Sequence, residues 1–216
     1  MKRIVAINCS PRIKWNTWEM VNAAAEGAKA EGAEIEFVNL YRLDRIHGCM
    51  SCFACKRKPN EGKCVFPDDL KDVLEKIRNA DGLIIGSPNY LGDVSAAFRA
   101  IYERLEFQSL TYNRETPRYP FKRIPVLFIM TSNASEEYYP MLAYDEMLKR
   151  YKEGLEMALG RTKVLLATNT LQVKDYSRYN WTMFDPQDKQ ERHEKVFPED
   201  LKKAFSVGSQ MVREAW

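Results

Sequence analysis

Long apolar runs are missing from this chain of 216 residues. In the N-terminal stretch MKRIVAIN the apolar part covers only Ile4 to Ile7, which is too short for the core of a signal peptide. No other run is long enough to span a bilayer, so we expect a cytoplasmic protein with no membrane partner. In such a reducing compartment, clustered cysteines serve as metal ligands or redox groups more often than as structural disulfides.

A strong excess of one charge is also missing. The chain has 33 Lys and Arg against 30 Asp and Glu, a net charge of +3, and the basic residues are scattered along it. This pattern gives no support to a nucleic-acid partner. Histidine is scarce: His47 lies near the cysteines and His193 lies in a polar stretch. We therefore assign no catalytic side chain.

Short apolar runs that alternate with helical patterns are present throughout. The runs predict strands at 3–8, 34–39, 82–86, 124–131 and 163–168. Their near-continuous apolar character is typical of parallel strands buried on both faces. The helical patterns cover 17–31, 68–79, 94–107, 144–159 and 198–215. This alternation predicts an α/β protein, a flavodoxin-like doubly wound three-layer sandwich with a five-stranded parallel sheet of order 2-1-3-4-5.

No internal repeat, linker or low-complexity tract divides the chain, so we expect a single domain over 1–216. Three long loops interrupt the alternation: a cysteine insertion at 44–66 and aromatic loops at 108–122 and 170–197. Long loops in compact domains usually have a role in function or assembly.

The loop after the first predicted strand is CSPRIKWNT, residues 9–17. It has neither the glycines of a dinucleotide fingerprint nor the Gly-Lys of a P-loop. It does offer the hydroxyls of Ser10 and Thr17, the Asn16 amide, the Arg12 guanidinium and the free amides of a helix N-terminus. Together these groups suit a phosphate monoester. The alternative is that Asn16 or Thr17 only caps the helix and Arg12 is a surface charge.

Two segments carry a resemblance to a known family. SPRxxxNT in this loop and ADGLIIGSPNYLGDVSAAFRAIYERL at 80–105 resemble the NADPH-dependent FMN reductase family, a branch of the flavodoxin-like superfamily. Arg99 and Glu103 stand where that family usually has Lys and Asp, and Arg104 is retained. The resemblance implies FMN binding by three loops: Ser10, Arg12, Asn16, Thr17 and Trp18 at the phosphate; Ser87, Pro88, Asn89, Tyr90, Leu91 and Gly92 at the isoalloxazine; and Thr131, Ser132 and Asn133.

The residues of the second loop suit a flat ring. Gly92 allows a close approach of the backbone, and Tyr90 offers a face for stacking. Backbone amides of 88–92 could bond the flavin O4 and N5 and so set its potential. The alternative, an ordinary Gly/Pro/Asn turn leaving a strand, does not explain why both loops fall at one edge of the predicted sheet.

The cysteine insertion, GCMSCFACKRKPNEGKCVFPDDL, resembles the cysteine segment of iron–sulfur flavoproteins, which bind a [4Fe–4S] cluster beside FMN. The resemblance implies four ligands: Cys49, Cys52, Cys55 and Cys64. Three closely spaced thiolates suit three corners of such a cluster and a distant fourth completes it. The spacing C-x2-C-x2-C-x8-C has a longer final gap than these flavoproteins usually show. The alternatives are reduced thiols packed against a neighbouring subunit or a zinc site, which usually pairs two C-x2-C knuckles or uses His.

By resemblance the chain is an FMN-dependent oxidoreductase. Its donor would be NAD(P)H or a ferredoxin-like protein, and its acceptor a small molecule or a protein. Hydride transfer to a flavin requires no protein acid or base. The alternatives are a flavodoxin-like electron carrier, which the mildly basic charge disfavours, and a zinc-stabilised interaction module.

The resemblance also implies a homodimer or homotetramer, because relatives bury the flavin ring at a subunit interface. The aromatic loops could supply apolar contacts there through Tyr112, Tyr119, Phe121, Tyr176, Tyr179 and Trp181. Packing of these loops onto the parent domain is the alternative.

Overall fold

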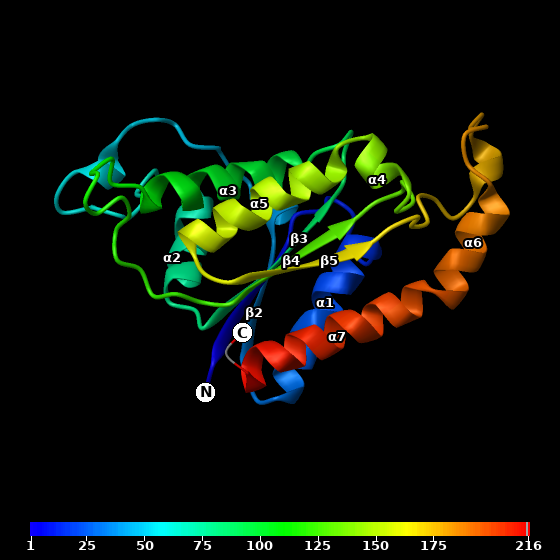
Figure 1. The fold of residues 1–216 in the computed structure, drawn as a ribbon, viewed down its shortest axis with the longest axis horizontal. Helices are drawn as coiled ribbons and strands as arrows, with labels where there is room; N and C mark the ends of the chain where they lie inside the picture. Colours follow the sequence, from blue (N-terminus) through cyan, green and yellow to red (C-terminus); the bar gives the residue numbers. More distant parts are fainter. Residues whose placement is uncertain (215) are drawn as a thin grey trace.

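The computed structural model describes residues 1–214 and 216. A five-stranded parallel sheet of order β2-β1-β3-β4-β5 forms its centre (Figure 1). The strands are β1 (Arg3–Asn8), β2 (Glu34–Asn39), β3 (Gly82–Pro88), β4 (Val126–Thr131) and β5 (Thr162–Ala167). The inner strands β1, β3 and β4 are buried almost throughout, as their apolar runs predict. The predicted flavodoxin-like fold is confirmed.

Helices cover both faces of this sheet. They are α1 (Asn16–Ala30), α2 (Leu70–Arg78), α3 (Ala96–Ser109), the short α4 (Tyr138–Met141), α5 (Tyr144–Ala158), α6 (Pro186–Lys195) and α7 (Phe197–Arg213). In Figure 1, α2, α3 and α5 lie on one face, and α1 and α7 lie on the other. None of the helices in the described part of the chain has the length and apolar character needed to cross a bilayer.

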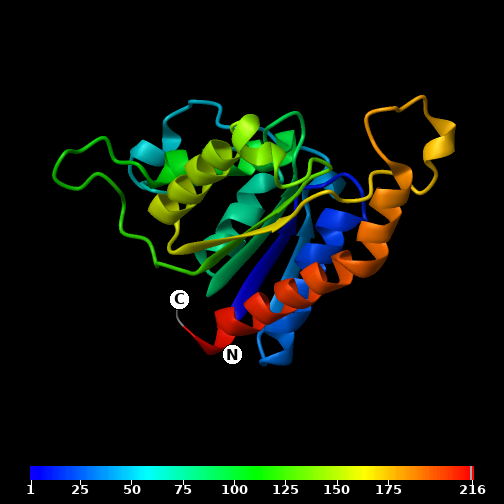
Figure 2. The same ribbon diagram turned by 45° about the vertical axis from the view of Figure 1, so that its right-hand side comes forward.

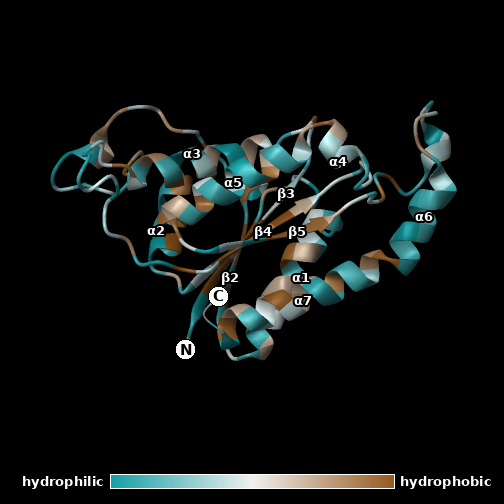
Figure 3. Cartoon of the chain, in the orientation of Figure 1, coloured by the Kyte–Doolittle hydropathy of each residue, from teal (hydrophilic) through white to brown (hydrophobic). Residues whose placement is uncertain are grey.

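Alternation along the strands gives each face its own apolar core. Val5 and Ile7 of β1 point to the layer of α2, α3 and α5, whereas Ile4 and Ala6 point to α1 and α7. Figure 3 shows the same arrangement, with apolar strands at the centre and the polar surface of α6 at the periphery.

Helices α1 and α7 pack backbone against backbone. A Cβ on Gly27 would lie 2.0 Å from the carbonyl oxygen of Phe205, and one on Gly208 would lie 1.9 Å from that of Ala24. Any side chain at either position would force the helices apart. The two glycines therefore hold α1, which leads from the first loop, firmly against α7.

The segment 170–197, which the sequence predicts as an irregular loop, contains the helix α6. Asp185 starts this helix, because its side chain accepts hydrogen bonds from the backbone N–H groups of Gln187 (2.9 Å) and Asp188 (3.4 Å), and Pro186 follows it. The predicted final helix, 198–215, is observed as α7, and residue 215 lies outside the described residues.

The cysteine insertion and the aromatic loop 108–122 lie side by side beyond the end of α3 (Figures 1 and 2). The Lys56 ammonium lies 5.7 Å from the centre of the Tyr119 ring, and the same ammonium donates to the Leu110 carbonyl across 2.6 Å. The two insertions therefore form one lobe at the far end of that helix.

Candidate functional site

The N-terminus of α1 has no side-chain cap. Trp15 occupies the cap position but accepts no hydrogen bond from the helix. The N–H groups of the first turn therefore remain available to an anion, and the helix dipole favours negative charge there. The Ser10 hydroxyl oxygen accepts from the N–H of Arg12 at 3.2 Å, which leaves its own hydrogen free to donate.

Asn16 and Thr17 bind neighbouring loops and do not cap the helix. The Asn16 side-chain amide donates to the Leu171 carbonyl across 2.8 Å, and the Thr17 hydroxyl lies 2.7 Å from that of Thr131. These contacts tie α1 to the segments that follow β5 and β4. The capping alternative for these two residues therefore does not describe this helix.

The loop after β3 is a sharp, internally bonded turn. Leu91 and Gly92 both have positive φ, 55° and 86°, and the Gly92 N–H donates to the Asn89 side-chain oxygen across 3.0 Å. Tyr90 and Asp93 exchange two backbone hydrogen bonds of 2.8 and 3.2 Å. Leu91 at the tip is fully exposed. The turn thus presents backbone and an apolar side chain beyond the edge of the sheet. We call residues 87–93 the ring loop.

The ring loop and the loop after β4 are joined. The Asn89 N–H donates to the Thr131 carbonyl across 2.7 Å, and the Ser132 N–H donates to the Ala167 carbonyl across 2.9 Å. Ser87 closes the other end, where its hydroxyl accepts from the N–H of Ser95 at 2.9 Å. The carboxyl ends of β3, β4 and β5 therefore form one connected rim, and the contacts of Thr17 with Thr131 and of Ser95 with the Cys9 carbonyl join the first loop to it.

A buried lysine supports this rim from α6. The Lys189 ammonium donates to the Asn133 carbonyl across 2.6 Å and to the side-chain oxygen of Asn169, and only 4% of the residue is exposed. Among the described residues it has no carboxylate within ion-pair distance. Burial lowers the pKa of Lys189 to about 8, although the nearby charge of Asp188 opposes this shift.

Arg12, in the first loop, lies near the ring loop and the aromatic segment after β5. Its guanidinium lies over the Trp15 ring, 4.1 Å from the ring centre. Partial burial lowers the pKa of Arg12, and the nearby phenols of Tyr90, Tyr179 and Tyr176 oppose that shift. Arg12 and Tyr90 therefore lie in one neighbourhood, as a shared ligand site requires.

Each of the three loops leaves one buried polar atom without a hydrogen-bond partner among the described residues. These atoms are Trp15 Nε1, Asn89 Nδ2 and Asn133 Oδ1. The Asn89 nitrogen lies beside the Tyr139 hydroxyl but makes no hydrogen bond of regular geometry with it. Buried polar groups are normally paired, so two donors and one acceptor around a single rim fit a polar ligand. Together with the uncapped α1 N-terminus, they suit a phosphorylated ring compound such as FMN.

Two residues of the predicted set have other surroundings. The Trp18 indole packs against Phe37 of β2 with ring centres 5.7 Å apart, so its backbone N–H is the part nearest the first loop. Pro88 is the last residue of β3. The sequence reasoning missed Trp15 and Lys189. The Arg-x-x-Trp spacing is a weak signal for Trp15, and nothing in the sequence points to Lys189, whose contacts lie far along the chain.

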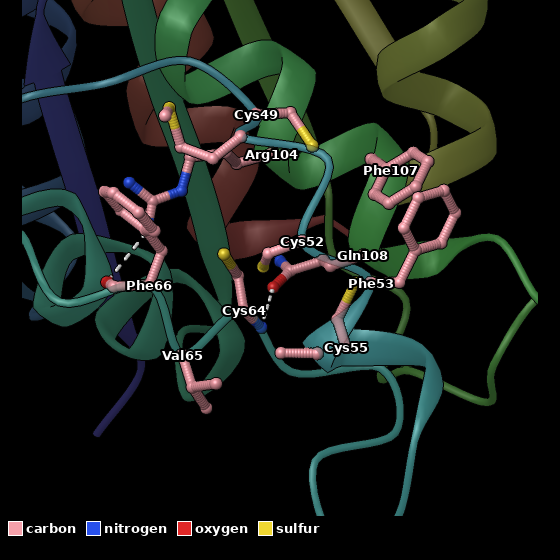
Figure 4. Close-up of a pocket in the computed structure, with 12 residues that line it drawn as sticks. Cys49, Cys52, Phe53, Cys55, Cys64, Val65, Phe66, Arg104, Phe107 and Gln108 are labelled. Carbon is pink, nitrogen blue, oxygen red and sulfur yellow. Dashed lines mark hydrogen bonds between the residues drawn. The ribbon is translucent and has the colours of Figure 1, made fainter.

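The four clustered cysteines line one cavity, away from the rim and against α3 (Figure 4). Aromatic and apolar side chains complete the wall: Phe53, Val65, Phe66 and Phe107. Cys55 is buried, and burial followed by the nearby charges of Cys64 and Cys49 raises its pKa, although Lys56 opposes this.

Side chains of α3 hold the cysteine insertion. The N–H of Cys49 donates to Glu103 across 3.2 Å, and the N–H of Cys64 donates to Gln108 across 3.0 Å. Between them, Arg104 and Asp68 form an ion pair of 2.6 Å in which each side chain is 1% exposed. Both ends of the insertion are therefore fixed to one helix.

The four thiols are suitable ligands for a metal cluster, but their side chains are not arranged around a common centre in this structure. All five cysteines of the chain are free, and four share the cavity. Among residues 1–214 and 216, however, no three His, Cys, Asp or Glu side chains stand together closely enough to hold a metal ion. Ligation would therefore require thiol side chains to turn toward a common centre. His47 is directed elsewhere, with its Nδ1 3.3 Å from Asp68.

Solved structures similar in fold include two reductases. One is an NAD(P)H:quinone oxidoreductase from Methanothermobacter marburgensis, with a TM-score of 0.71, 17% identity and coverage of 97% of this chain and 96% of that one. The other is an azoreductase from Bacillus anthracis, with a TM-score of 0.68, 12% identity and coverage of 97% and 100%. At these identities the likeness concerns the fold alone.

Similarity in sequence is found with iron–sulfur flavoproteins. One from Methanocaldococcus jannaschii is 38% identical over 102 residues, which are 47% of this chain and 51% of that protein. One from Methanosarcina thermophila is 34% identical over 102 residues, with the same two shares. The chain spans about half the length of these curated relatives. The sequence profile described as NADPH-dependent FMN reductase matches residues 2–139, well over half of the chain. The chain therefore belongs to the NADPH-dependent FMN reductase family.

Proposed function

We propose that this protein is an FMN-dependent oxidoreductase that takes electrons from NAD(P)H, or from a ferredoxin-like donor, and passes them to a small-molecule or protein acceptor. The observation that carries the proposal is the rim described above. Three loops meet there, each with a buried polar atom that lacks a partner, beside a helix N-terminus without a cap. Family membership supports the identity of the ligand.

The first loop would hold the FMN phosphate. The N–H groups of Asn16, Thr17 and Trp18 lie in the first turn of α1, and the Ser10 hydroxyl has a hydrogen free to donate. Arg12 would add a permanent positive charge, since a guanidinium stays protonated even when burial lowers its pKa. This combination would distinguish FMN from riboflavin, which has no phosphate.

The ring loop and the loop after β4 would hold the flavin ring. The hydrogen bonds at Asn89, Tyr90 and Gly92 shape the turn before any ligand arrives, so little conformational freedom would be lost on binding. FMN, when bound, supplies hydride acceptance together with the ability to release electrons singly. The side chains of the rim would orient the ring and exclude water, and none is required to act as an acid or base.

The cysteine cavity would hold a [4Fe–4S] cluster on Cys49, Cys52, Cys55 and Cys64. A metal centre would favour the thiolate form of Cys55, against the burial that raises its pKa. The apolar wall would keep water away from the buried sulfur of Cys55. The relatives named iron–sulfur flavoproteins support this part of the proposal.

A second copy of the chain would complete the assembly as a homodimer or homotetramer. Large apolar side chains are exposed near the rim, among them Leu91, Met141, Leu142 and Met183. Such side chains are more usual at subunit contacts than on a free surface. Analytical ultracentrifugation would test this, and a monomer at micromolar concentration would contradict it.

One preparation tests the main proposal. The protein is purified without oxygen, its visible spectrum is recorded, and FMN, iron and sulfide are assayed. We expect a coloured protein that binds one FMN and oxidises NADH or NADPH when a quinone is added. A colourless protein that binds no added FMN would contradict the proposal. One that binds FMN but oxidises neither nucleotide would exclude NAD(P)H as the donor and leave a ferredoxin-like donor or an electron carrier.

A pair of cysteine variants tests the metal site separately. Cys64→Ser is expected to lose most of the iron and sulfide, because a cluster needs its fourth thiolate. Cys9→Ala is the matched control, since Cys9 lies in the buried core away from the cavity. Equal iron content in both variants, or zinc in place of iron in the unaltered protein, would contradict the cluster.

A further inference from the structure

The Tyr151 hydroxyl stands between the ring loop and α3. It donates a hydrogen bond to Asp93 Oδ1 across 2.7 Å and accepts one from Arg99 Nη1 across 3.2 Å. Asp93 is the residue that exchanges backbone hydrogen bonds with Tyr90 at the base of the ring loop. A side chain of α5 therefore joins the ring loop to the first turn of α3.

The same series of contacts continues to the cysteine cavity. Arg99 Nε donates to Glu103 Oε1 across 2.9 Å, one turn further along α3, and Glu103 Oε2 accepts from the N–H of Cys49 across 3.2 Å. From Ser95 at the start of the helix to Glu103 the axis advances by about 12 Å. Asp93, Tyr151, Arg99, Glu103 and Cys49 thus form an unbroken polar series, which we call the α3 relay.

The middle of the α3 relay is rigid. Tyr151 is fully buried, and its ring packs edge-on against Phe98 (5.5 Å between centres) and Tyr102 (4.8 Å). Burial, with the hydrogen bond to Asp93, raises the pKa of Tyr151. The hydroxyl is therefore neutral and has a single hydrogen, which it gives to Asp93.

The charges along the α3 relay alternate. Asp93 and Glu103 are acidic, and the hydrogen bonds that Arg99 makes to Tyr151 and Glu103 raise its pKa, so it remains a cation. Asp93 lies 3.8 Å from Arg150 and is linked to Arg99 through the Tyr151 hydroxyl, whereas Arg99 is paired directly with Glu103. A displacement of Asp93 therefore acts on Arg99 through Tyr151 and then on Glu103. The last link acts on the backbone of the first cysteine in the cavity.

We propose that the α3 relay couples the two sites, so that FMN at the rim orders the backbone of Cys49 and metal loading of the cavity strengthens FMN binding. The proposal rests on the proposed function for the identity of the two ligands. FMN bound against the ring loop would keep Asp93 in the position that Tyr151 links, so that Arg99 keeps Glu103 against the Cys49 N–H. Tyr151, Arg99 and Glu103 are positioning residues, and linkage requires the effect to be equal in both directions.

The test compares Tyr151→Phe with Tyr102→Phe. The first variant removes the central hydroxyl and keeps the ring, whereas the second removes a hydroxyl from the same aromatic cluster outside the α3 relay. In the iron-free protein, the rate of Cys49 alkylation by iodoacetamide is measured by peptide mass spectrometry, with and without saturating FMN. Exposed Cys52 is the internal reference. We expect FMN to slow the reaction of Cys49 about fivefold in the unaltered protein and in Tyr102→Phe, and to have no effect in Tyr151→Phe.

The second experiment measures the effect of metal loading on FMN binding. The FMN dissociation constant is measured by fluorescence quenching before and after reconstitution with ferrous iron and sulfide. It should fall about fivefold on loading, except in Tyr151→Phe. If that variant fails to fold, Arg99→Met replaces it, because Arg99 is half-exposed and outside the core.

The outcomes separate the two proposals. A protein that binds no FMN would contradict both. A protein that binds FMN, but whose Cys49 reactivity is unchanged by it, would contradict the coupling alone. The same holds if Tyr151→Phe or Arg99→Met responds to FMN as fully as the unaltered protein.

Discussion

The hydroxyl groups of Thr17 in α1 and Thr131 at the end of β4 lie 2.7 Å apart, and both residues are almost completely buried. This contact joins the helix that would receive the phosphate to the strand end that would receive the ring. Because each hydroxyl is the other's partner, removing one leaves the other buried and unpaired.

A double-mutant cycle tests this contact. Thr17→Val and Thr131→Val should each lower the free energy of unfolding by about 1–2 kcal/mol, while the double variant should lose little more than either single one. The measurement is urea unfolding, and Thr182→Val on an exposed segment is the control. Strict additivity of the two single effects would contradict the contact.

The Arg12 guanidinium should recognise the phosphate and not the ring. Arg12→Met is expected to weaken FMN binding about 10- to 100-fold, since it removes a charge-assisted hydrogen bond, and to leave riboflavin binding unchanged. Fluorescence titration with both flavins measures this. Arg114→Met, in the exposed part of the aromatic loop, should change neither constant. Equal losses for FMN and riboflavin would place Arg12 elsewhere in the site.

The Arg104–Asp68 pair should be strongly sensitive to the loss of one partner. Arg104→Met is expected to destabilise the protein by about 3–5 kcal/mol, because it leaves a buried carboxylate unpaired, and Asp68→Leu in addition should restore part of the loss. Lys202→Met breaks an exposed ion pair and should cost less than about 1 kcal/mol. Chemical unfolding with iron content as a second readout would measure both effects.

Acid should weaken the same pair. Burial opposes the charged form of Asp68, but the hydrogen bond and charge of Arg104, with the contacts of His47, lower its pKa below the ordinary value. The stabilisation is therefore complete above a pH of about 4 and is lost as the pH falls through the lower folded pKa. The stability difference between the unaltered protein and Arg104→Met should shrink in that range. A difference that stays constant down to pH 2 would contradict the pairing.

Because of Lys189, the free energy of unfolding should rise as the pH increases from about 8 to 10.5. Its pKa is about 8 when folded, against an ordinary value of 10.5, so the unfolded chain binds the extra proton between these values. Stability therefore increases with pH in that window, by roughly 3 kcal/mol in total, whereas below pH 8 both states are protonated and the contribution is constant. Lys189→Met should lack this rise, and Lys149→Met, whose side chain is 75% exposed, should keep it. Equal pH profiles from denaturant unfolding would contradict the prediction.

Much of the fold could be predicted because apolar runs mark strands buried on both faces. The prediction was wrong at 170–197, where α6 has no apolar stripe in PQDKQERHEK. Only the Asp185-Pro186 pair signals a helix start there, and the helix depends on distant contacts such as the one from Lys189 to Asn133. Helix propensity along the chain carries no information about such contacts.

Some features of the candidate site could likewise be predicted from the sequence, and others could not. That Ser10, Tyr90 and Ser132 gather at one rim follows from the parallel order of the strands, since their carboxyl ends share an edge. The unpaired Trp15 indole and the buried Lys189 depend on tertiary packing and could not be predicted. Cysteine spacing suggested that the four thiols act together, but their place along α3 depends on the contacts of Glu103 and Gln108.

The contact of Gly27 with Phe205 and of Gly208 with Ala24 has a consequence for biosynthesis. A ribosome-bound chain that already contains every strand still lacks α7, and the back of α1 stays open to water until that helix emerges. The first turn of α1, which we propose binds the phosphate, would gain its firm support late, so we expect flavin loading to follow translation and not to accompany it.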